Sequence, residues 1–372
     1  MRMINSVTNI FSSKKNRSKA YFIIVLLSTI VFFFGYNFND PHGYFDVGRY
    51  YEMVDELFPA STPIGYIIAY EFAIGWDFIY YVVLFVFNQT SLGMPFVTGC
   101  VCFLYYYFSL KVFANNINKL TSQSTILLLG LFSLPNVIRV IENSRTSMAV
   151  LFLFIGILFH FKKKHFLFIF FFICAALTHI GSLMFSGLYF LVIVLYFLWL
   201  NKKQKLVKIL CLLLPPLLII SITFLMNTVL TSDVMDNLFA DGNYTKYLST
   251  QEGESKDNMS WVFKLQFWGT ALTSYVLMNL DDKNSFLKVL FLFYGSITIS
   301  MWSVTQNFLY RWMIVLPLIF SLYFTEVYVN TKNRESKTKN KSLLSTLQLI
   351  SCINIIIYLL MLIGNRDALF AF

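Results

Sequence analysis

Five arginines stand where the charge pattern of the chain does not explain them: Arg49, Arg139, Arg145, Arg311 and Arg366. The other cations are mostly lysines in short loops between apolar runs. An arginine at the end of an apolar span costs about 2–3 kcal/mol on membrane-insertion scales. The guanidinium group of arginine is planar and permanently charged, and it can donate hydrogen bonds to two oxygens of one phosphate. Snorkelling or an ion pair explains any one of them, but five on one predicted face favour an anion site.

Two of these arginines flank a predicted break between helices. Pro135 predicts a kink or an end in the preceding helix, and Asn143 or Ser144 is a suitable cap for the next one. Arg145 then falls in the first turn, where the helix field disfavours a cation unless an anion or an acid is close. We therefore expect a functional role for Arg145 and, more weakly, for Arg139.

The third candidate for chemistry is His179, which ends an apolar run just before the small-residue break that includes Ser182. None of the four histidines has metal-ligand spacing, so no metal is predicted. The sequence also contains no Gly-x-x-x-x-Gly-Lys-Ser/Thr loop and no Gly-x-Gly-x-x-Gly, so no nucleotide cofactor is predicted. A lone histidine at a span end is usually interfacial packing. At the predicted depth of Arg139 and Arg145 it is also placed to act as a general base or a phosphate ligand. Arg311 opens a later span between two aromatic residues.

A fourth polar group lies between the first two apolar stretches. Asp46, Arg49 and Tyr50 are spaced to share one face of a helix, and an apolar stripe follows them. This pattern predicts an amphipathic helix on the outer membrane surface. A purely local salt bridge between Asp46 and Arg49 is the alternative.

The elements that must position these residues are membrane spans. Hydrophobic residues make up 57% of the 372 and charged residues only 13%, against about 25% charged in a soluble globular protein. The fold class is therefore an all-α polytopic membrane protein of about eleven to thirteen transmembrane helices. Candidate spans are 20–36, 93–113, 123–138, 146–161, 166–180, 183–200, 207–228, 261–280, 286–304, 310–330 and 343–363, with 63–90 as a re-entrant segment or hairpin.

Loop charges predict the topology of one membrane domain over residues 1–372. Basic loops lie inside by the positive-inside rule, which makes 1–19 a cytoplasmic N-terminus and 331–342 a cytoplasmic loop. The long loops 37–62 and 229–258 are then outside, as is the C-terminus. The same rule explains the net charge of +10, so no nucleic-acid partner is expected.

Cysteine and tyrosine positions add two smaller expectations. All five cysteines lie inside apolar runs, which predicts free thiols rather than a disulfide framework. Tyrosines near run ends, among them 105–107, are typical of an interfacial aromatic belt.

Several motifs resemble those of the EpsG-like, or Wzy-type, bacterial polysaccharide polymerases. The similar segments are Asp46-x-x-Arg49-Tyr50, Pro63-Ile-Gly-Tyr66, Arg145-x-x-Met-Ala149, the loop 162–164, Ala176-Leu-Thr-His179-Ile-Gly-Ser182 and Asn307-Phe-Leu-Tyr-Arg311. Two departures are Arg145-Thr-Ser, where Arg-Gln-Gly/Ser is usual, and Ser61-Thr-Pro63, where Glu-Pro is usual.

The resemblance implies a GT-C-like helical bundle with outer-face loops in the bacterial plasma membrane. Such an enzyme joins oligosaccharide repeats carried on undecaprenyl pyrophosphate, outside the cell. The leaving diphosphate would be stabilised by Arg145, Arg311 and Arg139. The general base would be His179, with Asp46 as the second candidate. The implied substrate-binding residues are Arg49, Tyr50, Tyr66, Ser182 and Asn307. A chain-length co-polymerase and a flippase are possible partners besides the bilayer.

Three other functions compete with polymerisation. A lipid-linked oligosaccharide flippase predicts mid-span charges and an internal repeat, and neither is evident in the sequence. A membrane O-acyltransferase needs a histidine–acid pair, and His160 and His165 have no partner acid nearby in the sequence. An O-antigen ligase shares the chemistry of a polymerase, and the sequence separates the two poorly.

Overall fold

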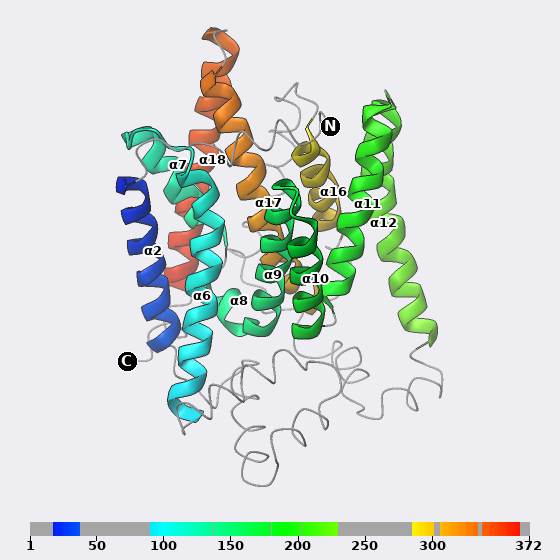
Figure 1. Ribbon diagram of the computed structural model, residues 1–372, viewed down its shortest axis with the longest axis horizontal. Coiled ribbons are helices and arrows are strands. Elements are labelled where there is room, and N and C mark those ends of the chain that lie inside the picture. Colours follow the sequence, from blue (N-terminus) through cyan, green and yellow to red (C-terminus); the bar gives the residue numbers. More distant parts are fainter. Residues whose placement is uncertain are drawn as a thin grey trace. The chain divides into compact units, whose positions relative to one another are not determined.

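The computed structural model describes residues 18–37, 90–135, 137–179, 181–201, 203–229, 285–300, 306–333 and 337–364 (Figure 1). Within these ranges every regular element is a helix. The helices are α2 (Ser18–Asn37), α6 (Thr90–Ala114), α7 (Ser122–Phe132), α8 (Val137–Glu142), α9 (Ser144–Phe161), α10 (His165–Thr178), α11 (Ser182–Leu200), α12 (Gln204–Val229), α16 (Phe286–Ser300), α17 (Gln306–Asn333) and α18 (Lys337–Gly364).

Five of these helices are long and apolar enough to cross a bilayer. Their qualifying stretches are Pro95–Ala114, Ser144–Phe161, Ser182–Leu200, Trp312–Lys332 and Ser342–Ile363. Four shorter apolar helices accompany them: Lys19–Phe33, Ser122–Phe132, His165–Thr178 and Phe286–Thr298. Apolar runs become helices in hydrocarbon because every backbone amide and carbonyl must be satisfied within the segment. The chain is an all-helical, polytopic membrane protein, as its composition predicted.

Helix faces that carry only large apolar side chains mark the surface presented to lipid. On α10 the exposed residues are Phe166, Ile169, Phe170, Ile173 and Leu177, which follow one another at helical spacing. Corresponding exposed stripes run along α2 and α18. Water would not tolerate such continuous apolar stripes, so acyl chains must cover them.

Most predicted spans agree with the observed helices, with one shorter than expected. Residues 123–138 were predicted as one span, but α7 ends at Phe132 and α8 follows separately after Pro135. The span predicted at 286–304 agrees with α16 as far as Ser300, and its last four residues lie outside the described residues. The predicted segment 63–90 up to residue 89, the span 261–280, and the loops 37–62 and 229–258 beyond their helical first residues lie outside the described residues.

The chain divides into two compact units. Unit 1 comprises Met1–Phe190 and Pro317–Phe372, and unit 2 comprises Leu191–Leu316. In unit 1, α2 packs along α6, α9 along α10, and α7 along α18. In unit 2, α12 packs against α16, and the indole N–H of Trp312 donates to Thr298 Oγ1 at 2.6 Å. The single membrane domain over 1–372 stays a prediction.

Glycines set the closest helix approaches within unit 1. A methyl group added at Gly99 would lie 3.2 Å from the carbonyl oxygen of Phe32, and one at Gly156 would lie 2.8 Å from the ring of Phe172. Small residues allow such approaches where dispersion and not water exclusion drives the packing. These contacts hold α6 against α2 and α9 against α10.

The cysteine prediction is confirmed, and part of the tyrosine prediction is wrong. All five cysteines are free. Tyr105 and Tyr106 are completely buried inside unit 1 rather than placed at a membrane interface. Their rings pack edge-on, with centroids 5.7 Å apart. An apolar helix shows no sequence difference between a face turned to lipid and one turned to protein, which is why the position of these rings was misjudged.

Candidate active site

The break after α7 is held by a tyrosine of α6. The Ser133 N–H caps α7 by donating to Leu129 O, and Pro135 ends the helix, as predicted. Tyr106 Oη donates to the carbonyl oxygen of Pro135 at 3.1 Å, in a buried position. An unpaired carbonyl is costly inside a membrane protein, so this bond stabilises the break. It thereby fixes where α8 begins.

A six-residue helix, α8, then leads into α9 through Asn143. The Asn143 N–H and its side-chain Nδ2 both donate to Arg139 O, at 3.1 and 3.3 Å. Ser147 Oγ reaches back to Val140 O at 3.0 Å. Asn143 occupies the N-cap position of α9, as predicted, but its side chain makes no capping bond to α9. The first turn of α9 therefore has no side-chain cap.

Arg139 and Arg145 lie on the two sides of this junction. Arg145 is in the first turn of α9, as predicted, and both arginines are half-buried. The apolar neighbours of Arg139 on α8 are buried. A half-buried arginine covers apolar surface with its aliphatic stem and keeps the guanidinium in a polar environment. In Figure 1, α8 lies beside the end of α9 at which Arg145 is found.

His179 is the first residue beyond α10 and is buried, with 6% of its surface exposed. Its backbone is extended (φ −157°, ψ 116°), its N–H donates to Ala175 O, and its carbonyl accepts from Ser182 N–H at 2.9 Å. A methyl group on Gly181 would lie 3.1 Å from His179 Nε2. The imidazole therefore packs directly against a residue without a side chain, which explains the small residue at this position.

The hairpin of α9 and α10 brings Arg145 and His179 to one height. Gly156 faces Phe168 and Phe172, and the Phe159 and Phe171 rings stack with centroids 5.5 Å apart. A helix rises about 1.5 Å per residue, so nine residues cover about 14 Å. Nine residues from Gly156 toward the start of α9 lead to Ser147, and nine residues from the midpoint of Phe168 and Phe172 toward the end of α10 lead to His179. Arg145 lies about 3 Å beyond that height. We call this end of α9, α10 and α11 the Arg145 end; it comprises residues 139–147 and 178–186.

Three buried hydroxyl groups at the Arg145 end have no hydrogen-bond partner: Ser144 Oγ, Ser182 Oγ and Ser186 Oγ. Many helical hydroxyls in the described residues donate to a carbonyl one turn earlier, as Thr178 Oγ1 does to Cys174 O at 2.7 Å, and two others outside this end, Ser28 Oγ and Thr98 Oγ1, also have no partner. A buried hydroxyl without a partner costs about 1–3 kcal/mol. An oxygen atom of a bound ligand would supply the missing partner.

Of these three serines, sequence reasoning nominated Ser182 and missed Ser144 and Ser186 as ligand-binding candidates. Ser144 was considered only as a helix cap. The available signal was its position directly before Arg145 at the start of an apolar span. Ser186 lies one turn after Ser182 on α11, the spacing at which two side chains share a helix face.

The structure places the remaining predicted site residues as follows. Asp46, Arg49, Tyr50 and Tyr66 lie outside the described residues. Asn307 and Arg311 belong to the N-terminal part of α17 in unit 2, and their side chains are likewise outside the described residues. The described part of the chain holds no group of three or more histidine, cysteine or carboxylate residues suited to a metal ion.

Comparison with known proteins identifies the family. The model of the EpsG family matches residues 19–368, from the start of α2 to beyond α18. The chain belongs to the EpsG family. This EpsG-family protein is thus a membrane protein of a family linked to exopolysaccharide biosynthesis. No curated protein and no solved structure matches it. The family resemblance read from its motifs is confirmed.

Proposed function

We propose that this EpsG-family protein polymerises oligosaccharide repeats carried on undecaprenyl pyrophosphate, at the outer face of the bacterial plasma membrane. The observation that carries the proposal is the Arg145 end, which holds two half-buried arginines, a buried histidine and three buried serines whose hydroxyls have no partner. A diphosphate needs cations with fork geometry, and a sugar hydroxyl needs a base to take its proton. Both kinds of group are present there.

In the proposed reaction a hydroxyl oxygen of the acceptor glycan attacks the anomeric carbon of the donor. A new carbon–oxygen bond forms, and the bond between the anomeric carbon and the diphosphate oxygen breaks with its electron pair. Negative charge therefore develops on the departing lipid diphosphate. Arg145 and Arg139 stabilise that charge, because preorganised cations act most strongly where charge appears in the transition state.

His179 accepts the proton of the attacking hydroxyl. Its carbonyl and N–H are both used in backbone hydrogen bonds, so the position of the residue is set by the turn between α10 and α11. The packing of Gly181 against Nε2 restricts the imidazole further. A held imidazole needs less reorganisation than a mobile one during proton transfer.

The proposed orientation follows from the basic loops. With the N-terminus in the cytoplasm, α9 and α11 both begin outside, which puts the Arg145 end at the outer face. Lipid-linked repeats are presented there after a flippase has turned them over, and a co-polymerase would control chain length. Asp46, Arg49, Tyr50, Tyr66, Asn307 and Arg311 complete the proposed substrate contacts from outer segments.

The test is transfer by the purified full-length protein in proteoliposomes. The substrate is a synthetic undecaprenyl-diphosphate oligosaccharide of the repeat made by the source cells, and the product is a ladder on a gel. Arg145→Lys keeps the charge and removes the fork, and we expect about 10²-fold slower transfer, the usual effect of losing one preorganised donor. His179→Gln should have a similar effect.

The matched control is His165→Gln, because His165 is exposed at the opposite end of α10. It should leave the ladder unchanged. Normal ladders from both Arg145→Lys and His179→Gln would remove the Arg145 end from catalysis. Transfer to lipid A without chain growth would indicate a ligase, and lipid-linked repeats left facing the cytoplasm in deletion cells would indicate a flippase.

A further inference from the structure

Two buried hydroxyl groups lie one turn apart on α11, close to where the helix begins after His179. Ser182 is fully buried and Ser186 is 7% exposed, and neither Oγ has a hydrogen-bond partner. Residues four apart share one face of a helix, and we call these two residues the serine pair. Single unpartnered hydroxyls occur at Ser28 on α2 and Thr98 on α6, but within the described ranges only α11 carries two of them on one face.

The hydroxyl of Ser186 has an acceptor of the usual kind within its own helix and does not use it. A serine inside a helix can donate to the carbonyl one turn earlier, as Ser296 and Ser351 do at 2.8 and 2.9 Å. The corresponding acceptor for Ser186 is the carbonyl of Ser182. A buried hydroxyl that forgoes this bond destabilises the folded protein. A polar atom of a ligand would restore the missing hydrogen bond.

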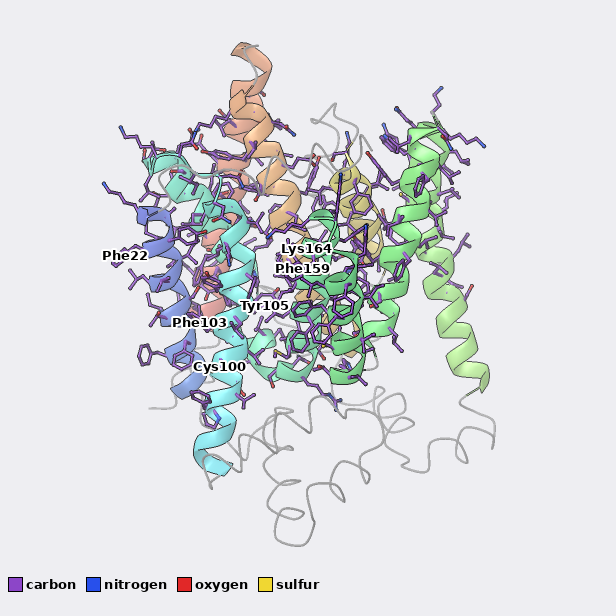
Figure 2. All side chains as sticks on the ribbon, viewed as in Figure 1. Phe22, Cys100, Phe103, Tyr105, Phe159 and Lys164 are labelled. Atoms are coloured by element: carbon purple, nitrogen blue, oxygen red, sulfur yellow. The ribbon has the colours of Figure 1, made fainter. Side chains whose placement is uncertain are left out.

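A layer of aromatic rings lies one turn beyond the serine pair along α11. The ring centroid of Phe172 on α10 is 5.8 Å from the centroids of both Tyr189 and Phe190 on α11. These rings separate the serine pair from the turn end of the hairpin of α9 and α10, near which Phe159 and Lys164 are labelled in Figure 2. A ligand therefore reaches the serine pair either from the start of α11 or from the lipid side.

The lipid-facing side of α11 lacks one side chain next to the serine pair. Leu183 and Phe190 are exposed, and Gly187 lies between them on the same face. Nothing lies within 4 Å of a Cβ added at Gly187, and we call this place the Gly187 notch. Ser186 and Phe190 differ by only about 40° around the helix axis. The serine pair therefore borders the lipid-facing side of α11.

The chemistry of the notch and of the serine pair together indicates the class of ligand. Serine hydroxyls donate hydrogen bonds to phosphate oxygens, and the exposed residues around the notch are apolar. The ligand must therefore join an oxygen-rich head to an apolar chain. The methyl branches of a polyprenyl chain fill a gap the size of one side chain, whereas an unbranched acyl chain leaves part of it empty and loses those dispersion contacts.

We infer that the serine pair binds the diphosphate of a polyprenyl carrier, with the first isoprene units of the chain in the Gly187 notch between Leu183 and Phe190. Ser182 Oγ and Ser186 Oγ each donate a hydrogen bond to a diphosphate oxygen. The inference rests on the proposed function, because it names the part of the substrate that this place holds. It adds Ser186 and Gly187 to the binding residues, and it requires that the carrier binds without its glycan.

The experiment is thermal unfolding of the purified full-length protein in detergent, titrated with undecaprenyl diphosphate as the probe. The probe should raise the unfolding temperature of wild type. Ser186→Ala removes an unpartnered buried hydroxyl, so without probe it should unfold at a higher temperature than wild type. It should nevertheless bind the probe about ten-fold more weakly, through the loss of one hydrogen bond to a charged group. Misfolding cannot produce both changes.

Gly187→Leu tests the notch, because its side chain occupies the place of the isoprene units; it should also weaken probe binding about ten-fold. Ser28→Ala is the matched control for the hydroxyl, since Ser28 Oγ is likewise buried and unpartnered but lies on α2. It should raise the unfolding temperature and leave probe affinity unchanged. Ile169→Phe adds bulk to the exposed face of α10 instead, and it should leave probe affinity unchanged as well.

Wild-type affinity for the probe in both Ser186→Ala and Gly187→Leu would overturn the inference, as would equal competition by phosphatidylglycerol. The outcome is separable from that of the transfer assay. Probe binding that depends on Ser186, in a wild-type protein that forms no glycan ladder, would support the carrier site and contradict polymerisation. A ladder that Arg145→Lys abolishes, together with unchanged probe affinity in Ser186→Ala and Gly187→Leu, would support polymerisation and contradict the carrier site.

Discussion

Among the glycines whose surroundings the structure describes, Gly130 is the one at which an added methyl group should disturb the packing most. It lies in α7, and a Cβ built there would be 2.3 Å from Ser351 Cβ, 2.5 Å from Ser351 Oγ and 2.6 Å from Ser351 Cα on α18. A serine hydroxyl can rotate away, but its Cα and Cβ are fixed by the backbone. Gly130→Ala therefore forces α18 to withdraw by about 1.1 Å for Ser351 Cβ to reach the 3.4 Å of ordinary contact.

The cost of that withdrawal can be bounded. A gap of 0.5–1 Å forfeits about a quarter to a half of each dispersion contact across it, and overpacking typically costs about 1–3 kcal/mol. The higher helix propensity of alanine offsets about 1 kcal/mol of this loss in unfolding free energy. The upper end of about 3 kcal/mol applies here because backbone atoms clash, so we expect a net loss of about 2 kcal/mol in unfolding free energy for Gly130→Ala, measured by equilibrium unfolding in mixed micelles.

Gly187→Ala is the matched control, because nothing lies within 4 Å of a Cβ added there. It should leave stability unchanged or raise it by up to about 1 kcal/mol. Adding Ser351→Gly to Gly130→Ala removes the Cβ and Oγ contacts but keeps the Cα, so recovery should be partial. Equal stabilities for Gly130→Ala and Gly187→Ala would refute the close packing of α7 on α18.

Three further predictions concern the site and the turn between α9 and α10. Tyr106→Phe removes the hydrogen bond from Tyr106 Oη to Pro135 O, and it should lower the unfolding free energy by about 1 kcal/mol in the same unfolding assay. An unchanged unfolding free energy would mean that this hydrogen bond does not stabilise the break between α7 and α8. Gly181→Ala displaces the His179 ring by a few tenths of an ångström and should slow glycan transfer about ten-fold with little change in unfolding temperature; full activity would argue against His179 as the base. Because the pKa of Lys162 is lowered in the folded state, stability should increase as pH rises through that pKa toward 10.5, and Lys162→Gln should flatten that part of the pH profile.

Sequence reasoning located the helices well because the bilayer leaves the backbone few choices. Apolar runs of about 20 residues must form helices in hydrocarbon. Pro135 marked the break after α7, and the residues after it placed Arg145 in the first turn of α9. The motif resemblance predicted the EpsG family, which the family match over residues 19–368 establishes.

The contacts between helices required the tertiary structure. A uniformly apolar helix has no polar face to distinguish lipid from protein, because both surroundings are apolar. The burial of Tyr105 and Tyr106 therefore could not be inferred.

The sequence by itself determined that the chain is a polytopic helical membrane protein, which residues open and close its spans, and on which segments its arginines and lysines lie. Only the tertiary structure decided that Ser144 and Ser182 keep buried, unpartnered hydroxyls, and that Lys111 approaches Lys162 from another helix. The physical reason is the distance along the chain over which each kind of interaction acts. Hydropathy and helix-breaking residues act within a segment of the chain, whereas the partner of a side chain is set by helix packing between residues distant in sequence.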